Sequence, residues 1–168
     1  MIEVYPHIFV GPMSDCRTNS AINTVHLPKI PCHQNAVGYT GNLDKNHPNY
    51  LWKESSSDIF FNTVDCDGPG YWRIEIFRKF LDWTIPRYNQ GKRILIHCNA
   101  AQSRSPAFVM FLDAWLNKKT WEQAYADMMP RYPEYNRYAV SYKLMGVSIF
   151  LRDHWKELLD YNPNEQSA

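Results

Sequence analysis

The sequence contains no run of about 18 apolar residues, the length that a membrane-spanning helix requires. Its N-terminus has no basic segment followed by an apolar core, the pattern of a secretory signal peptide. Its 18 basic and 17 acidic residues give a formal net charge of +1, so the chain lacks the basic character of proteins that bind nucleic acid or anionic membranes. These absences predict a soluble, cytoplasmic protein with neither nucleic acid nor a membrane as its partner.

The chain also lacks any Cys-x-x-Cys pair or His-rich spacing, so the sequence predicts no metal site. Its four cysteines are Cys16, Cys32, Cys66 and Cys98. Without a signal peptide, and with 168 residues of which 45% are hydrophobic, the chain is expected to keep free thiols and to form its own core. The adjacent Cys32 and His33 make a poor nucleophile and base, because neighbours on an irregular segment seldom face one reacting atom.

The most informative stretch of the sequence begins at Ile94. The branched apolar residues Ile94–Ile96 predict a short strand buried on both faces. The apolar run 106–112 predicts a helix, with Ser105 as its N-cap and proline at its first position. Cys98 is therefore expected between a strand end and a helix start, where unpaired backbone N–H groups and the helix dipole bind anions and favour a thiolate.

Five residues separate Cys98 from Arg104, and their backbone amides can curl around a tetrahedral oxyanion. These residues are Asn99, Ala100, Ala101, Gln102 and Ser103. Arg104 can close the ring with two parallel hydrogen bonds to phosphate oxygens. This arrangement suits an in-line attack of sulfur on phosphorus, with the negative charge held by preorganised donors.

The segment resembles the phosphate-binding loop of the cysteine-dependent protein phosphatases, and the length of the chain resembles that of their small dual-specificity branch. The family's loop has the pattern His-Cys-x-x-Gly-x-x-Arg-Ser/Thr, which this sequence matches at His97, Cys98, Arg104 and Ser105. The resemblance implies a single-domain α/β fold of the protein-tyrosine-phosphatase type, with a mixed, mostly parallel sheet flanked by helices. It also implies hydrolysis of phosphate esters through a cysteinyl phosphate, without a metal or organic cofactor.

The sequence departs from the family's loop at Ala101, where the family usually has glycine. Glycine is used where φ is positive or where the backbone approaches a ligand closely. If Ala101 has positive φ, the strain is of the order of 1–3 kcal/mol. We therefore expect a working loop that is slower or tighter than usual.

The resemblance also implies roles for residues around the nucleophile. His97 is expected to order the loop and Ser105 to help expel the thiolate in the second step. The leaving oxygen needs a proton donor, and the family's general acid lies on a loop about as far before the cysteine as Asp67, which precedes Cys98 by 31 residues (98 − 67). Asp67 is the predicted acid, and Asp65 stays open as the alternative.

The remaining patterns predict the elements around this loop. One domain is expected over 1–161, with a tail over 162–168. The predicted strands lie within Glu3–Gly11 and at Thr24–Leu27 and Ile59–Val64, and the predicted helices at Tyr71–Tyr88, Thr120–Met129 and Tyr138–Leu159. Pro86 should kink or end the first of these helices early, and Thr120 with Gln123 forms a capping box that opens the second.

The segment from Pro28 to Asn49 is too rich in Pro, Gly and Asn for long regular structure. Its Pro-Cys-His, Gly-Tyr-Thr-Gly and His-Pro-x-Tyr-Leu pieces resemble the N-terminal half of some microbial and viral dual-specificity-like phosphatases. Two interpretations stay open: a lid or wall over the substrate pocket, and a surface loop pinned by Tyr39, Tyr50 and Trp52.

The loop from Asn99 to Ser103 carries no charge, whereas lipid and inositol phosphatases of this superfamily have lysines there. The predicted substrate is therefore phosphotyrosine in a protein or peptide, with phosphoserine and phosphothreonine as further candidates. An inactive phosphate-binding relative and an RNA 5′-phosphatase are the alternatives, although near-neutral charge argues against the second. A rhodanese-type sulfur transferase does not fit, because its cysteine loop is shorter. The physiological substrate and the oligomeric state stay open.

Overall fold

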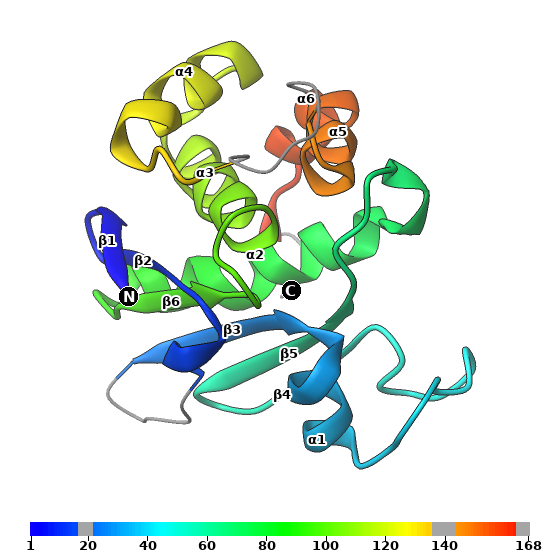
Figure 1. Cartoon of the computed structure of the whole chain (residues 1–168). Coiled ribbons are helices and arrows are strands. Elements are labelled where there is room, and N and C mark those ends of the chain that lie inside the picture. The colour runs from blue at the N-terminus through cyan, green and yellow to red at the C-terminus, as the bar shows by residue number, and fades with distance from the viewer. Residues whose placement is uncertain (17–21, 136–143, 164–168) are drawn as a thin grey trace.

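A computed structural model describes residues 1–16, 22–135 and 144–163 of the chain. Its centre is a six-stranded sheet with the strand order β1-β2-β6-β3-β5-β4 (Figure 1). The strands are β1 (Ile2–Tyr5), β2 (Ile8–Gly11), β3 (Asn23–Pro28), β4 (Trp52–Glu54), β5 (Asp58–Thr63) and β6 (Ile94–His97). Strands β2, β6, β3 and β5 run parallel, and β1 and β4 pair antiparallel at the two edges. The predicted mixed, mostly parallel sheet is confirmed.

The two central strands, β3 and β6, are buried along their whole length. A strand covered on both faces has no polar face, which explains why Ile94–Ile96 is a continuous apolar run. Because β2, β6, β3 and β5 are parallel, their carboxyl ends meet at one edge of the sheet, where ligands bind in open α/β sheets. The loop that follows His97 leaves the sheet at this edge.

In Figure 1, helices α3 to α6 lie above the strands of the sheet, and α1 lies below them. Both α2 and α3 contact β6. The helices are α1 (Gln34–Val37), α2 (Ile74–Asn89), α3 (Arg104–Asn117), α4 (Trp121–Arg131), α5 (Gly146–Asp153) and α6 (Trp155–Leu159). Within the described ranges, no helix combines the length and the apolar character that a membrane crossing requires.

The structure confirms the predicted start of α4 and corrects other predicted helix boundaries. The capping box of α4 is present, since Thr120 accepts from the Gln123 amide and the Gln123 side chain accepts from the Thr120 amide. Ser105 was expected to cap α3, but the helix already begins at Arg104, and the Ser105 side chain faces Cys98 instead. Pro86 does not end α2, which continues to Asn89, because a proline in the last turn removes a single backbone hydrogen bond.

The prediction of one long final helix over Tyr138–Leu159 is wrong for the residues that the structure describes. Its first residues, 138–143, lie outside the described residues, and the remainder forms two short helices, α5 and α6. Met145 is extended, so α5 begins at Gly146, and His154 has non-helical backbone angles that separate α5 from α6. A continuous apolar periodicity does not detect such breaks, because both helices bury the same kind of face. Of the predicted tail, residues 164–168 also lie outside the described residues.

The segment from Pro28 to Asn49 contains no long regular element, as predicted. It begins with the irregular helical turn η2 (Lys29–His33), which leads into the four-residue helix α1. The His33 ring pins the segment, with Nδ1 at 2.7 Å from the Tyr39 hydroxyl and Nε2 at 2.9 Å from the Asn49 carbonyl oxygen. His33 is therefore structural here. The edge strand β4 follows and was not predicted, because three residues give no clear alternation.

Candidate active site

Cys98 lies directly after β6, in the loop that leads into α3, and its side chain is buried. Its Sγ atom is 3.1 Å from the Ser105 hydroxyl, and the Ser105 backbone N–H donates to the same sulfur at 3.4 Å. The loop is tied to β2 and the turn after it, since the Cys98 amide donates to the Gly11 carbonyl and the Met13 amide to the Asn99 carbonyl. The thiol therefore lies in a hydrogen-bonded loop at the N-terminus of α3.

Ala101 has a φ of 57°, in the left-handed region that favours glycine. An alanine there costs of the order of 1–3 kcal/mol unless its surroundings fix the conformation. The Tyr132 hydroxyl, from the end of α4, donates a 2.7 Å hydrogen bond to the Ala101 carbonyl oxygen. Burial, with a smaller contribution from the charge of Cys98, raises the pKa of Tyr132, so its hydroxyl stays a donor. Ala101 thus has the positive φ that implies strain, and a hydrogen bond from a residue distant in sequence holds it in this conformation.

The Arg104 guanidinium is 4% exposed and lies across the carboxyl ends of β3 and β5. Its Nη1 atom donates to the Thr63 carbonyl oxygen at 3.0 Å and to the Leu27 carbonyl oxygen at 3.4 Å. Its Nη2 atom donates to the Asn99 side-chain oxygen at 2.6 Å, which closes the loop from Asn99 to Arg104. The arginine is thus held by backbone carbonyls and by the loop itself.

The Arg104 Nε–H group is buried and has no hydrogen-bond partner among the described residues. A buried donor without an acceptor costs about 1–3 kcal/mol and calls for an explanation. An oxyanion bound in the loop would supply the acceptor. The unpaired donor and the N-terminus of α3 are both features that favour an anion in this loop.

The two candidate acids lie on the loop that follows β5, and both are exposed. Asp65 accepts a 3.0 Å hydrogen bond from the Ser103 hydroxyl, which links it to the Cys98 loop. The Asp67 carboxylate accepts no hydrogen bond from the described residues and is free to meet a ligand. Cys66 lies between the two acids in sequence, and burial together with the charge of Asp65 raises the pKa of its thiol. The structure therefore brings both carboxylates to the side of the sheet where Cys98 lies, in different surroundings.

The N-terminus of α5 lies against this acid loop. The Gly146 amide donates a 2.9 Å hydrogen bond to the Cys66 carbonyl oxygen. A Cβ atom at Gly146 would lie 2.0 Å from the Gly68 carbonyl oxygen, so this close approach requires glycine. Nothing in the sequence pattern indicated that Gly146 contacts a loop so distant along the chain.

No protein-family model matches this sequence, and no curated protein matches it. Solved structures do resemble it. DUSP15 has a TM-score of 0.66 at 14% identity, over 99% of this chain and 94% of the other. The human tyrosine phosphatase-like serine/threonine/tyrosine-interacting protein has a TM-score of 0.59 at 20% identity, over 94% and 96%. Tk-PTP in its active form has a TM-score of 0.55 at 14% identity, over 95% of each chain.

This chain has the dual-specificity phosphatase fold. The fold that the resemblance of the Cys98 loop implied is thus confirmed for this chain. In this fold, the strand-loop-helix unit of β6, the Cys98 loop and α3 lies at the carboxyl edge of the sheet, with the β5 loop beside it.

A pocket of about 430 Å³ lies next to the candidate site. It shares Thr63, whose carbonyl oxygen accepts from Arg104. Three cationic side chains, Lys29, Lys45 and Arg73, contribute to its lining. Aromatic and polar residues complete it, among them Asn42, Tyr50, Tyr71 and Trp72. Part of the segment from Pro28 to Asn49 therefore forms one wall of this pocket.

Behind the Cys98 loop lies a cluster that the sequence did not predict. His97 Nε2 is 2.7 Å from His26 Nδ1, and the sulfurs of Cys16 and Cys32 lie beside the two rings. The Cys16 and Cys32 sulfurs are 3.5 Å apart, and Cys32 donating to Cys16 lowers the pKa of the Cys16 thiol. All four cysteines are free. The four residues of the cluster are widely spaced in sequence, so no metal-ligand spacing marked them.

Proposed function

We propose that the protein is a phosphomonoester hydrolase that dephosphorylates phosphotyrosine in proteins through a cysteinyl-phosphate intermediate. The observation that carries this proposal is the arrangement around Cys98: a buried thiol at a helix N-terminus that accepts from the Ser105 amide, in a loop closed by Arg104 with an unpaired buried donor. Phosphoserine and phosphothreonine are further candidates. The dual-specificity phosphatase fold supports a reaction of this class without identifying the substrate.

In the first step, the Cys98 thiolate attacks phosphorus in line with the leaving oxygen. An S–P bond forms as the P–O bond to the substrate breaks. The amides of Asn99 to Ser103 and the Arg104 guanidinium hold the three equatorial oxygens, on which the negative charge is spread. Asp67 gives its proton to the leaving oxygen, so the product leaves as a neutral hydroxyl group.

In the second step, water attacks the phosphorus of the cysteinyl phosphate. Asp67, now a carboxylate, takes the proton from this water, and the S–P bond breaks to release inorganic phosphate. The Ser105 hydroxyl lies 3.1 Å from the sulfur and stabilises the departing thiolate with a hydrogen bond. His97 takes no proton in either step and serves to order the loop.

The pocket beside the site favours substrates with acidic groups near the phosphorylated residue. Lys29, Lys45 and Arg73 line it, while the loop from Asn99 to Ser103 that holds the phosphate is uncharged. The positive charges that would attract the substrate thus lie outside the phosphate-binding loop. This arrangement favours a substrate with a single phosphate group and acidic residues next to the phosphorylated one. Of the two interpretations of the segment from Pro28 to Asn49, a wall of the substrate pocket is the one we propose.

The proposal is tested by hydrolysis of p-nitrophenyl phosphate and of a phosphotyrosine peptide, with reductant present. We expect turnover in the wild type, a loss of about a thousandfold or more in Cys98→Ser, and wild-type rates in Cys66→Ser. A wild type that binds vanadate without any turnover would identify an inactive phosphate-binding protein. Faster release of phosphate from the 5′ end of an RNA than from the peptide would favour the RNA alternative.

The role of the pocket is tested with phosphopeptides that carry either acidic or neutral residues beside phosphotyrosine. We expect Lys45→Gln to raise KM for the acidic peptide by about two- to fivefold, as one partly solvated charge pair is lost, and to leave KM for p-nitrophenyl phosphate unchanged. Lys92→Gln, an exposed lysine remote in sequence from the pocket lining, is the matched control. Equal effects of both variants, or none, would contradict this assignment.

A further inference from the structure

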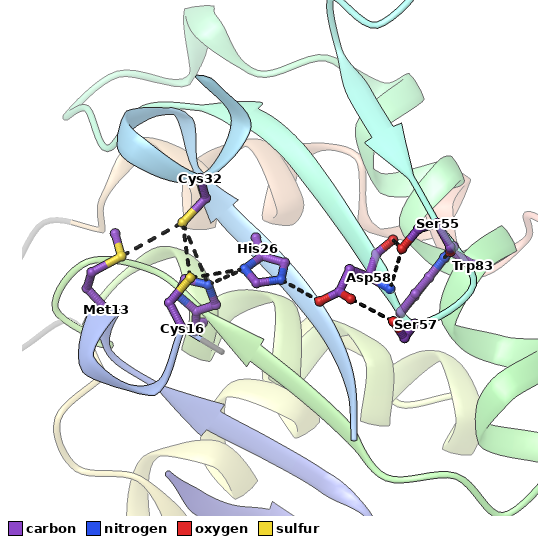
Figure 2. A network of polar contacts seen from close by, with 9 residues as sticks. Met13, Cys16, His26, Cys32, Ser55, Ser57, Asp58 and Trp83 are labelled. Carbon is purple, nitrogen blue, oxygen red and sulfur yellow. Dashed lines mark hydrogen bonds and ion pairs between the residues drawn. The ribbon is translucent and has the colours of Figure 1, made fainter. Parts of the chain in front are cut away.

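Four side chains that commonly bind zinc converge behind the Cys98 loop: Cys16, His26, Cys32 and His97. Their ligand atoms all lie within 4.8 Å of one another. Figure 2 shows Cys16 in contact with both Cys32 and the His26 ring, with Met13 beside Cys32. Both histidines are fully buried, Cys32 is buried, and Cys16 is partly exposed. Cys16 is therefore the most solvent-accessible of the four side chains.

The sheet itself brings the four residues together. His26 on β3 is paired in register with His97 on the neighbouring parallel strand β6. Cys16 follows the short turn after β2, and Cys32 lies in the turn η2 after β3. All four thus sit at the carboxyl ends of adjacent strands. This placement comes from the fold, so the spacing of the residues in sequence carries no motif.

Three of the separations between the ligand atoms lie close to the edges of a tetrahedral zinc site. Zinc bonds of about 2.3 Å to sulfur and 2.0–2.1 Å to nitrogen give edges of roughly 3.3–3.8 Å. Cys16 Sγ lies 3.5 Å from Cys32 Sγ and 3.4 Å from His26 Nδ1, and Cys32 Sγ lies 4.0 Å from His97 Nε2. The two ring nitrogens, 2.7 Å apart, are closer than such an edge, so binding would separate them by roughly half an ångström.

The contact with Asp58 directs one nitrogen of the His26 ring toward the cluster. His26 Nε2 is 2.8 Å from the Asp58 carboxylate, so it donates to this carboxylate, and His26 Nδ1 is left with its lone pair facing His97 Nε2 at 2.7 Å. An N–H···N hydrogen bond between the two rings accounts for this distance. A metal ion would replace the proton of that bond, with one nitrogen of each ring as a ligand.

Asp58 completes the arrangement that orients metal-binding histidines in many proteins. A carboxylate behind the ring fixes its tautomer and makes the nitrogen on the other side a better ligand. Asp58 is itself held, because its Oδ2 accepts from the Ser57 hydroxyl at 2.7 Å and its backbone amide donates to the Ser55 hydroxyl at 3.1 Å. Figure 2 shows this chain from Ser57 through Asp58 to His26.

We propose that Cys16, His26, Cys32 and His97 bind one zinc ion, with two thiolates and two neutral imidazoles as its ligands. Such a complex has no net charge, so its burial costs less than that of an ion with a net charge. Its role is structural, because four protein ligands leave no position for water or substrate. Since His97 directly precedes Cys98, the ion would anchor the start of the phosphate-binding loop.

The first test uses the purified full chain, reduced, freed of metal with a chelator and then given Zn²⁺ or Co²⁺. We expect one Zn²⁺ per chain by elemental analysis and a higher melting temperature with Zn²⁺ than without. Bound Co²⁺ should show the strong visible bands of a tetrahedral ion and a thiolate-to-cobalt charge-transfer band. These readouts depend neither on phosphatase activity nor on the proposed substrate.

Variants assign the ligands. Cys16→Ser and Cys32→Ser should each lose the cobalt bands, whereas Cys66→Ser, with the same number of remaining thiols, should keep them. Cys98→Ser should also keep them, which separates this site from the nucleophile. Asp58→Asn should retain the tetrahedral spectrum while binding the ion about 10- to 100-fold more weakly.

Three results would overturn the proposal. One is a reduced wild type that binds neither Zn²⁺ nor Co²⁺ and melts at the same temperature with and without them. The second is a cobalt spectrum that survives in both Cys16→Ser and Cys32→Ser. The third is a chain that, purified with Zn²⁺ and reductant, is two hydrogens lighter because Cys16 and Cys32 have joined as a disulfide.

Discussion

The Tyr132 hydroxyl donates its hydrogen bond to the carbonyl oxygen of Ala101, the residue of the Cys98 loop with positive φ. The strained alanine and the phenol that holds it are 31 residues apart in sequence. The loop's conformation therefore depends on the end of α4 as well as on its own sequence. A left-handed conformation that favours glycine is thus adopted by an alanine that a tertiary hydrogen bond holds in place.

Tyr132→Phe should weaken both the fold and the loop. The substitution leaves the buried Ala101 carbonyl without its donor, so we expect the free energy of unfolding to fall by about 1–3 kcal/mol and vanadate to bind several-fold more weakly. Urea unfolding and vanadate titration measure the two effects. Tyr161→Phe, which removes the hydroxyl that donates to Asp82, is the control and should leave vanadate affinity unchanged. Equal vanadate affinity in both variants would show that Tyr132 does not hold the loop.

Ser105→Ala should slow the second chemical step. The variant loses the hydroxyl that lies 3.1 Å from the Cys98 sulfur, and with it a charge-assisted hydrogen bond worth about 1.5–3 kcal/mol, or roughly 10- to 100-fold in rate. We expect a burst of p-nitrophenol followed by a slow steady state, because cysteinyl phosphate accumulates. Rapid-mixing kinetics and intact-protein mass spectrometry detect the intermediate. A variant that is slower but shows no burst would place the effect of Ser105 in the first step.

The features that the sequence predicted depend on interactions between residues that are close together along the chain. A branched apolar run, a small polar loop and an apolar helix were enough to place Cys98 and Arg104, and the Thr120 capping box needed four consecutive residues. The support for the loop could not be predicted in this way. Tyr132 reaches Ala101 across the domain, and the cluster of His97 with His26 arises from strand register, which sequence spacing does not contain.

The errors have the same origin. Ser105 satisfied the composition of an N-cap, yet its hydroxyl is directed to the Cys98 sulfur, and the helix begins one residue earlier. The final helix satisfied the apolar periodicity, yet α5 begins only at Gly146, where the chain meets the acid loop. In both places a tertiary contact overrides a local preference. Both places also adjoin the candidate active site.

Asp67→Asn should reduce kcat by about a hundredfold or more, because the leaving oxygen loses its proton donor, while the affinity for vanadate stays within about twofold. Asp65→Asn should retain most of kcat, since its carboxylate already accepts from the Ser103 hydroxyl and serves the loop. The two variants, measured with the same phosphotyrosine peptide, form a matched pair on one loop. The reverse order of their effects would make Asp65 the general acid.

Gly146→Ala should act on the same step from outside the loop. An added Cβ would lie 2.0 Å from the Gly68 carbonyl oxygen and 2.7 Å from the Cys66 carbonyl oxygen, so the backbone of the acid loop must move. Displacing Asp67 by about 1 Å is expected to lower kcat by about 10- to 100-fold. The three atoms nearest to the added Cβ all belong to the acid loop, so vanadate affinity should be retained.

The control for this variant is Gly70→Ala, since a Cβ at Gly70 meets open space and its backbone needs no glycine. We expect it to keep the wild-type kcat and to change the free energy of unfolding by about 0.5 kcal/mol or less. Steady-state kinetics, vanadate titration and urea unfolding on both variants separate a displaced acid loop from a general loss of stability. If Gly146→Ala lowers kcat and vanadate affinity by the same factor, α5 supports the whole site and does not position the acid loop alone.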